Sequence, residues 1–183
     1  MSNKRIERLR DKLLERGMDS QRPPPLNSDA RPEVAELTQR VRPSRPEVVE
    51  MTQRVRPFAE AMYLVLAADG GLRERERDVL RGALRTLTDG LLSSAALDAM
   101  LARFERERAL QGLDMRLDTV AAALYSDRSD SELALSLMAA AGETDGKLTA
   151  AEQAIILALG QRLGLTQQRL DELLYGGEEP VSA

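Results

Sequence analysis

Four carboxylates stand in two matching places of the 183-residue sequence. Residues 69–76 and 145–152 share the pattern Asp-Gly-x-Leu-x-x-x-Glu. Carboxylate oxygens are the ligands that calcium and magnesium prefer. A chain without His or Cys can offer a metal ion little besides oxygen. The repeated acidic spacing therefore raises the hypothesis of a divalent-ion site built from two loops.

The second copy matches the back half of a calcium-binding EF-hand loop. Gly146, Leu148 and Glu152 fall where that loop needs a sharp turn, an apolar anchor and a bidentate glutamate. The front half does not match, because its first ligand position holds Ala141. A Ca²⁺ or Mg²⁺ site would therefore need both segments to pool their oxygens. The ligands predicted for such a site are Asp69, Glu76, Glu143, Asp145 and Glu152.

The same residues also have an architectural interpretation. Each segment joins the end of one apolar run to the start of the next, as a corner between two helices does. The glycine tolerates a positive φ just after a helix end. Glu76 and Glu152 fall in the first turn of the following helix, where negative charge suits the helix dipole. Thr149 and Glu152 also form a capping-box pattern. The sequence leaves the ion site and the helix corner open as alternatives.

The composition excludes several classes of enzyme. Without His and Cys the chain cannot form a Ser-His-Asp triad, a cysteine nucleophile, a disulfide or a Cys/His zinc site. It contains no phosphate-binding loop and no dinucleotide fingerprint. Residues 58–183 hold 13 Lys and Arg against 21 Asp and Glu, an acidic balance unsuited to nucleic acid. An enzyme would need carboxylates alone as its acid and base. We therefore predict a protein that is not an enzyme and does not bind nucleic acid, and Ca²⁺ or Mg²⁺ is the cofactor that its oxygen ligands could hold.

Apolar residues recur at helical spacing through most of the chain. Aromatic residues make up only 3% of it, so the core must be built from Leu, Ala, Val, Ile and Met. Helices are predicted over 58–68, 73–88, 93–108, 113–125, 130–143, 150–163 and 166–175. Since strand-like alternation is missing and the connections are short, we predict an all-α fold. It is a compact bundle of about seven short helices in two pseudo-related halves, with an N-terminal extension.

The domain boundaries follow from this pattern. Pro57 is the predicted first-turn residue of the first domain helix. The chain before it begins with a short amphipathic helix over 3–16 and a proline-rich linker over 18–30. No signal peptide and no membrane-spanning run is recognisable, so a cytoplasmic location is expected. The regions expected are an extension over 1–56, a helical domain over 57–176 and a tail over 177–183.

The extension contains a tandem repeat. Residues 31–43 and 45–57 are identical at 11 of 13 positions, and both differences keep an apolar side chain. One hypothesis is that each copy is a short binding motif for a partner protein or for self-association. The alternative is a duplication within a linker that tolerates insertions. The apolar residues predicted to contact a partner lie at helical spacing and are Val34, Leu37, Val41, Val48, Met51 and Val55.

Residues 57–176 resemble the TerB-like domain of tellurite-resistance proteins, which is related to the N-terminal domain of a membrane-associated DnaJ-type co-chaperone. The resemblance rests on Leu66-Ala-Ala-Asp-Gly70 with Glu76. It also rests on Asp145-Gly-Lys-Leu-Thr149 with Glu152 and then Leu163-Gly-Leu165. It implies an all-helical, non-enzymatic domain whose paired acidic positions are metal-ion sites. This sequence departs from the family where Arg73, Arg75 and Arg77 flank Glu76, because arginines so close can pair with the acids.

The resemblance also implies a function. Proteins of this family act in bacterial stress responses to toxic oxyanions and other chemical insults, often in assemblies near the inner membrane. We therefore expect an interaction or scaffold protein that works through protein partners, with peripheral association to an inner-membrane complex. The alternative is a calcium- or magnesium-responsive sensor that uses the corner carboxylates.

Overall fold

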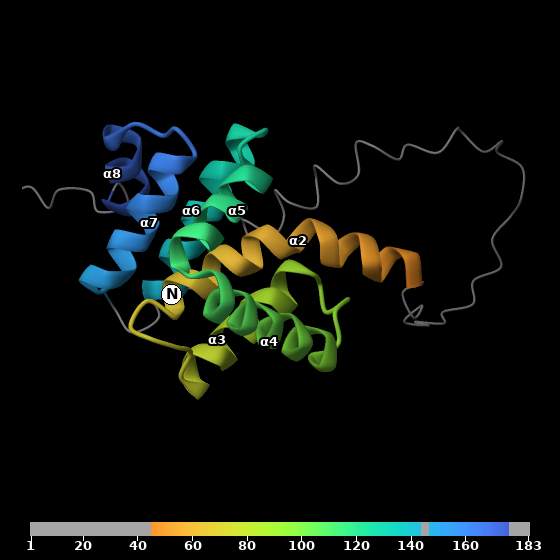
Figure 1. The fold of residues 1–183 in the computed structure, drawn as a ribbon. Coiled ribbons are helices and arrows are strands. Elements are labelled where there is room, and N and C mark those ends of the chain that lie inside the picture. The colour runs from red at the N-terminus through yellow and green to blue at the C-terminus, as the bar shows by residue number, and fades with distance from the viewer. Residues whose placement is uncertain (1–44, 144–146, 176–183) are drawn as a thin grey trace, which may run out of the picture.

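The computed structural model describes residues 45–143 and 147–175, which form seven α-helices and contain no β-strand (Figure 1). This confirms the predicted all-α bundle. Six of the seven helices begin within two residues of the predicted start. In chain order the helices are α2 (Arg45–Leu66), α3 (Glu74–Leu87), α4 (Ser94–Gln111), α5 (Leu113–Leu124), α6 (Arg128–Gly142), α7 (Ala150–Arg162) and α8 (Gln167–Tyr175).

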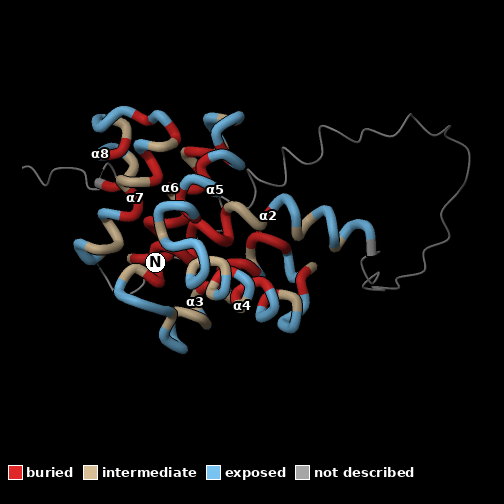
Figure 2. Tube along the Cα trace, viewed as in Figure 1, coloured by how far each residue is buried: buried red, intermediate tan, exposed pale blue. Residues whose placement is uncertain are grey.

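The C-terminal half of α2 is the central element of the domain. Every residue from 58 to 67 is buried, so this segment is covered on all sides (Figure 2). Apart from Glu60 the segment is apolar all round, as is typical of a helix that lies inside a bundle rather than on its surface. The other helices supply that cover: α2 packs most extensively against α6, and it also contacts α3, α4, α5 and α7.

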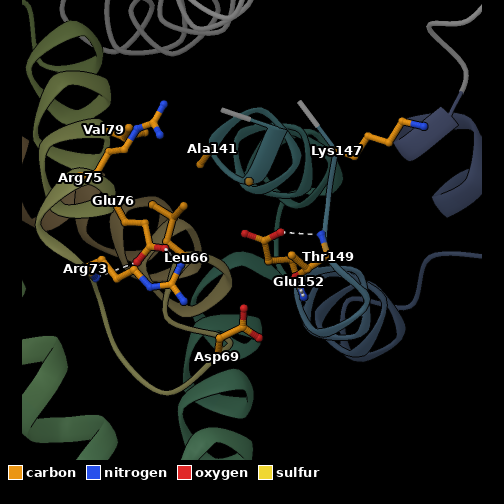
Figure 3. A pocket seen from close by; sticks show the side chains of 11 residues that line it. Leu66, Asp69, Arg73, Arg75, Glu76, Val79, Ala141, Lys147, Thr149 and Glu152 are labelled. Carbon is orange, nitrogen blue, oxygen red and sulfur yellow. Dashed lines mark hydrogen bonds and ion pairs between the residues drawn. The ribbon is translucent and has the colours of Figure 1, made fainter. Parts of the chain in front are cut away.

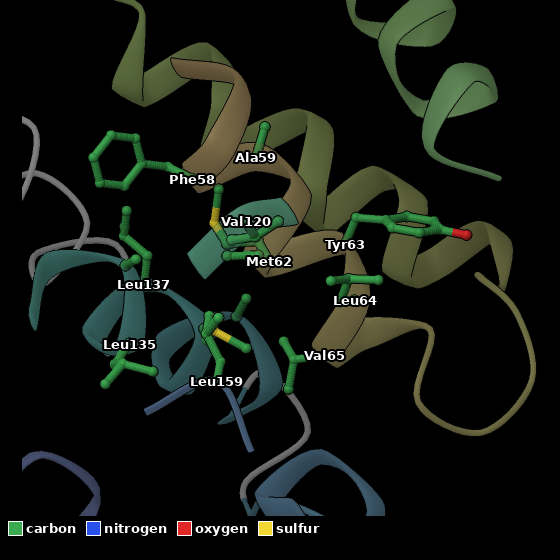
Figure 4. Close-up of a cluster of buried hydrophobic side chains, with 14 of the residues drawn as sticks. Phe58, Ala59, Met62, Tyr63, Leu64, Val65, Val120, Leu135, Leu137 and Leu159 are labelled. Atoms are coloured by element: carbon green, nitrogen blue, oxygen red, sulfur yellow. The ribbon is translucent and has the colours of Figure 1, made fainter. Parts of the chain in front are cut away.

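Large aliphatic side chains from four helices meet around α2 (Figure 4). Met62 and Val65 of α2 lie among Val120 of α5, Leu137 of α6 and Leu159 of α7, all of them at most 1% exposed. Burying one such side chain contributes about 1.5–3 kcal/mol. The core is accordingly built mainly from aliphatic side chains, as the composition predicted.

Two helical hairpins, α2–α3 and α6–α7, occupy equivalent positions. Their first helices pack against each other, α2 also contacts α7, and α6 also contacts α3. The residue before the second helix has nearly the same backbone conformation in both: φ −75°, ψ 159° at Arg73 and φ −69°, ψ 162° at Thr149. The starts of α3 and α7 are therefore related in backbone geometry as well as in sequence.

The first helix begins earlier than predicted. α2 starts at Arg45 and runs through Pro57, so the expected helix start at Pro57 is wrong and the expected boundary between residues 56 and 57 falls inside a helix. Pro57 cannot donate to the carbonyl of Gln53, and an interior proline costs a helix about 3 kcal/mol. Burial on both sides offsets this cost, since Val55 is 0% exposed and Phe58 only 3%. The second repeat is thus the N-terminal half of α2.

An ion pair joins α8 to α6 and makes stability depend on pH. Arg169 Nη2 lies 2.8 Å from Glu132 Oε2, and this hydrogen bond lowers the pKa of Glu132 below its ordinary value of 4.5. As the pH falls, Glu132 is therefore protonated at a higher pH in the unfolded chain than in the folded chain, and this favours unfolding.

We expect the free energy of unfolding to fall as the pH drops from 4.5 toward the lowered pKa, and Glu132→Gln to remove part of this dependence. Urea denaturation between pH 3 and pH 7 measures it. Glu132→Gln should be less stable than wild type at pH 7, and the difference should shrink in acid. A difference that stays constant with pH would contradict the assignment.

Candidate functional site

The first corner, between α2 and α3, is built on two glycines. Gly70 has a φ of +118°, which favours glycine, and its N–H donates to the carbonyl of Ala67 at 3.2 Å. Leu72 packs against the core beneath the turn, as predicted. Glu76 Oε2 then accepts the backbone N–H of Arg73 at 2.7 Å. The glutamate thereby satisfies a donor that the start of α3 leaves open.

The second corner, before α7, is capped from both sides. Glu152 Oε2 accepts the backbone N–H of Thr149 at 2.7 Å, and Thr149 Oγ1 accepts the backbone N–H of Glu152 at 3.2 Å. This confirms the predicted capping box. Leu148 packs against the core, in the position that Leu72 holds in the first corner. Asp145 and Gly146 lie outside the described residues.

Gly142, at the end of α6, lets the second corner approach closely. A methyl group at this position would lie 2.4 Å from Leu148 Cδ2 and 3.5 Å from the carboxyl carbon of Glu152. The first distance is far below the roughly 3.5–4.0 Å of carbon atoms in contact. Because Gly142 has no side chain, Leu148 and Glu152 can pack directly against the end of α6.

The two corners meet at one pocket of about 90 Å³ (Figure 3). Glu76 on the α3 side and Glu152 on the α7 side lie on facing walls. The lining carries charges of both signs, in the acids Asp69, Glu76 and Glu152 and the bases Arg73, Arg75 and Lys147. Apolar and small residues complete it, namely Leu66, Val79, Ala141, Gly142 and Thr149. Segments about 76 residues apart in sequence thus share a single mixed-charge pocket.

The described part of the pocket does not resemble a metal centre. Within residues 45–143 and 147–175, no group of three or more acidic side chains is placed to hold a metal ion. Glu76 and Glu152 each already accept a backbone N–H. Glu143 ends α6 as its C-cap and is not among the lining residues. Because Asp145 lies outside the described residues, the predicted ligand set stays a prediction.

The capping arrangement predicts a difference between the two corners. Thr149→Ala removes the hydroxyl that accepts the Glu152 N–H and should lower the free energy of unfolding by about 1 kcal/mol. The matched change Arg73→Ala should alter it by less than about 0.5 kcal/mol. An arginine side chain has no acceptor for the N–H groups at the start of α3, and the Arg73 side chain is 78% exposed. Urea denaturation measures both variants, and equal losses would contradict the capping role of Thr149.

A buried ion cluster lies away from the pocket and was not predicted. Glu60 of α2 and Arg116 of α5 are 3% and 4% exposed, and Arg116 Nε donates to Glu60 Oε1 at 2.6 Å. Arg116 Nη2 lies 3.0 Å from Glu107 Oε2 of α4, and Arg56 Nη2 lies 3.2 Å from both oxygens of Glu107. One signal was available in the sequence: Glu60 interrupts an otherwise apolar run, so it needs a buried partner.

The structure divides the residues predicted to contact a partner. Val34, Leu37 and Val41 lie outside the described residues. Val55 is 0% exposed, and Val48 and Met51 are partly buried against the core. In this structure the second repeat therefore packs on its own domain.

No protein-family model, curated protein or solved structure matches the chain. Among the helices that the structure describes, none combines the length and the apolar character needed to cross a bilayer.

Proposed function

We propose that the chain is a non-enzymatic, TerB-like interaction protein of the bacterial response to tellurite or related chemical stress. The observation that carries this proposal is that the α2–α3 corner and the described start of α7 line one mixed-charge pocket. The corner motifs are the same residues on which the resemblance to TerB-like domains rests. In this proposal the protein works in the cytoplasm through protein partners, including partners at an inner-membrane complex.

Recognition suits the chemistry of this pocket better than catalysis. Its two glutamates are held by the starts of α3 and α7, so they are poor candidates for a proton donor and acceptor. Arg73 and Arg75 are exposed at its rim. Their guanidinium groups are suited to carboxylates on a partner surface. A pocket between two capped helix starts, with arginines exposed on the α3 side, is a recognition surface in this proposal.

A complementation experiment tests the proposal. Cells lacking the gene receive the wild type, an Arg73→Glu/Arg75→Glu variant or the control Arg85→Glu, which changes an exposed arginine of α3 outside the pocket lining. We expect wild type and control to restore growth on tellurite and to co-purify the same partners. The pocket variant should fail in both assays. Normal growth of the deletion strain under tellurite and related stresses would contradict the stress role. Full rescue by the pocket variant would contradict the pocket.

A calcium- or magnesium-responsive sensor is the alternative. It is favoured by the presence of Asp69, Glu76 and Glu152 in one pocket, to which Asp145 could add a fourth carboxylate. The three cationic residues in the same lining oppose it, because they compete for the same oxygens.

We therefore expect isothermal titration of the full chain with millimolar CaCl₂ or MgCl₂ to give no binding heat. If heat appears, Asp69→Asn and Asp145→Asn separate a real site from a surface effect. The matched control is Asp114→Asn, whose side chain is 90% exposed on α5. Heat that is lost in the corner variants and kept in the control would establish a metal site at the corners and overturn our expectation.

A further inference from the structure

We propose that the two repeats compete for one strip on the helical domain, so that residues 31–43 can replace residues 45–57 of the same chain. The strip is the surface that the N-terminal half of α2 covers in this structure, between Val48 and Arg56. The strip holds one repeat at a time. Whichever repeat occupies it, the other repeat is available to bind a partner protein. The proposal deepens the interaction role proposed above and rests on it for the identity of that partner.

The contacts of the second repeat define what the strip requires. Val55 is fully buried, and Met51 and Val48 are partly buried at the spacing of one helix face. Arg56 extends from the same helix to Glu107 of α4, with Nη2 3.2 Å from both carboxylate oxygens. The strip thus needs an apolar ridge of three side chains followed by an arginine.

The first repeat supplies the same ridge. Its counterparts to Val48, Met51, Val55 and Arg56 are Val34, Leu37, Val41 and Arg42. The only change in the ridge is Met to Leu, an apolar swap of similar volume that cores tolerate.

The other difference between the copies sets Ala35 against Val49. The Val49 side chain is 50% exposed, which places this change on the outer face of the helix. Both differences therefore fall where docking tolerates them.

Pro57 weakens the connection between the second repeat and the core of α2. It lacks the N–H that would continue the helical hydrogen bonds. The helix that joins residues 45–57 to the buried segment from Phe58 onward therefore lacks one backbone hydrogen bond. Releasing them breaks fewer backbone hydrogen bonds than releasing a regular helix would. Replacement by residues 31–43 leaves the intervening residues as a loop, and the entropy of closing a loop grows only slowly with its length.

Competition within the chain is favoured over exchange between chains. A segment on the same chain meets the strip at an effective concentration in the millimolar range for short linkers. A second molecule in dilute solution cannot match this. The proposal therefore commits to the first repeat of the same chain as the occupant.

Cross-linking in the full chain tests the proposal. The sequence has no Cys, so introduced pairs react without background. The acceptor is Arg103→Cys, because Arg103 Nε lies 2.6 Å from Glu107 Oε1, the same oxygen that Arg56 contacts. Combined with Arg103→Cys, Arg56→Cys reports the second repeat and Arg42→Cys the first. Arg40→Cys is the matched off-face control, because its counterpart Arg54 is exposed. The cross-linker is a short bismaleimide, used on highly diluted protein. Gel electrophoresis separates cross-links within one chain from those between two chains, and peptide masses identify the linked residues.

We expect three results from the cross-linking. The Arg42→Cys pair should react within the chain more than the Arg40→Cys control. Val55→Asp, which vacates the strip, should raise this product several-fold, and Val41→Asp should abolish it. Pro57→Ala should lower it, because it repairs the helix. Circular dichroism verifies that each variant is folded. If Val55→Asp does not fold, Val55→Ala is used in its place.

Two outcomes would overturn the proposal. One is an Arg42→Cys product no larger than that of the Arg40→Cys control and unchanged by the Val55 variants. The other is a product found only between chains, which would mean exchange between molecules. Failure of the tellurite experiment would leave these results unaffected, so the two proposals can fail separately.

Discussion

Glu60→Leu is expected to lower the free energy of unfolding by about 3–5 kcal/mol, the usual loss when one partner of a buried ion pair is removed. The substitution leaves the guanidinium of Arg116 buried without its closest acid, since Glu60 Oε1 lies 2.5 Å from Nη2 and 2.6 Å from Nε. Urea denaturation at neutral pH measures the loss. It should appear as a lower midpoint with an unchanged dependence on urea concentration.

The surroundings of the pair explain why the loss should be so large. Burial raises the pKa of Glu60, and the hydrogen bond and positive charge of Arg116 act against that rise. Partial burial also acts to raise the pKa of Glu107, but Arg103, Arg116 and Arg56 together hold it below its ordinary value. Glu107 thus already shares its charge among several cations. It can replace Glu60 only in part.

A double variant and a surface control make this prediction specific. Glu60→Leu combined with Arg116→Met removes both buried charges and should recover most of the loss, because replacing a whole buried pair by apolar residues is often close to neutral. Glu50→Leu makes the same change on the exposed side of α2, where Glu50 is 65% exposed and 3.9 Å from Arg54. Its effect should stay below about 1 kcal/mol. A Glu60→Leu loss no larger than that of Glu50→Leu would refute the structural role of the pair.

The sequence predicted the helices because their signals are local. Leu80, Leu84 and Leu87 follow helical spacing and are all buried on the inner face of α3. Ser93 accepts the N–H of Ala96 at 3.2 Å and begins α4, as a serine before an apolar run indicates. The corner residues Thr149 and Glu152 were likewise identified three positions apart. Each of these features depends on neighbours within one or two turns.

The start of α2 and the pocket were not predictable in the same way. Pro57 is a favourable first-turn residue by local rules, but burial of Val55 and Phe58 by distant helices outweighs its cost. That the corners share one pocket follows from the packing of α2 against α6, which no local pattern specifies. Glu60 could be recognised as a charge in an apolar run, but its partner Arg116 lies 56 residues further on.

Gly160→Ala is the second substitution expected to have a large effect, a loss of about 1–3 kcal/mol of unfolding free energy from overpacking. Gly160 of α7 faces Leu170 of α8, which is only 1% exposed. A methyl group at Gly160 would lie 2.3 Å from Leu170 Cδ2 and 3.2 Å from its Cγ, so the leucine would have to leave its place. Thermal and urea denaturation should both show the loss, although alanine favours helix formation over glycine.

The same substitution in α3 supplies the matched control. Gly82 lies in the interior of that helix, is exposed, and has no atom within 4 Å of an added methyl group. Gly82→Ala should therefore stabilise the protein by about 0.5–1 kcal/mol, the ordinary gain in a helix interior. The two variants share one chemical change and differ only in what the new methyl group meets. Opposite signs would establish that α8 packs directly on α7 at Gly160, and a gain at both positions would show that it does not.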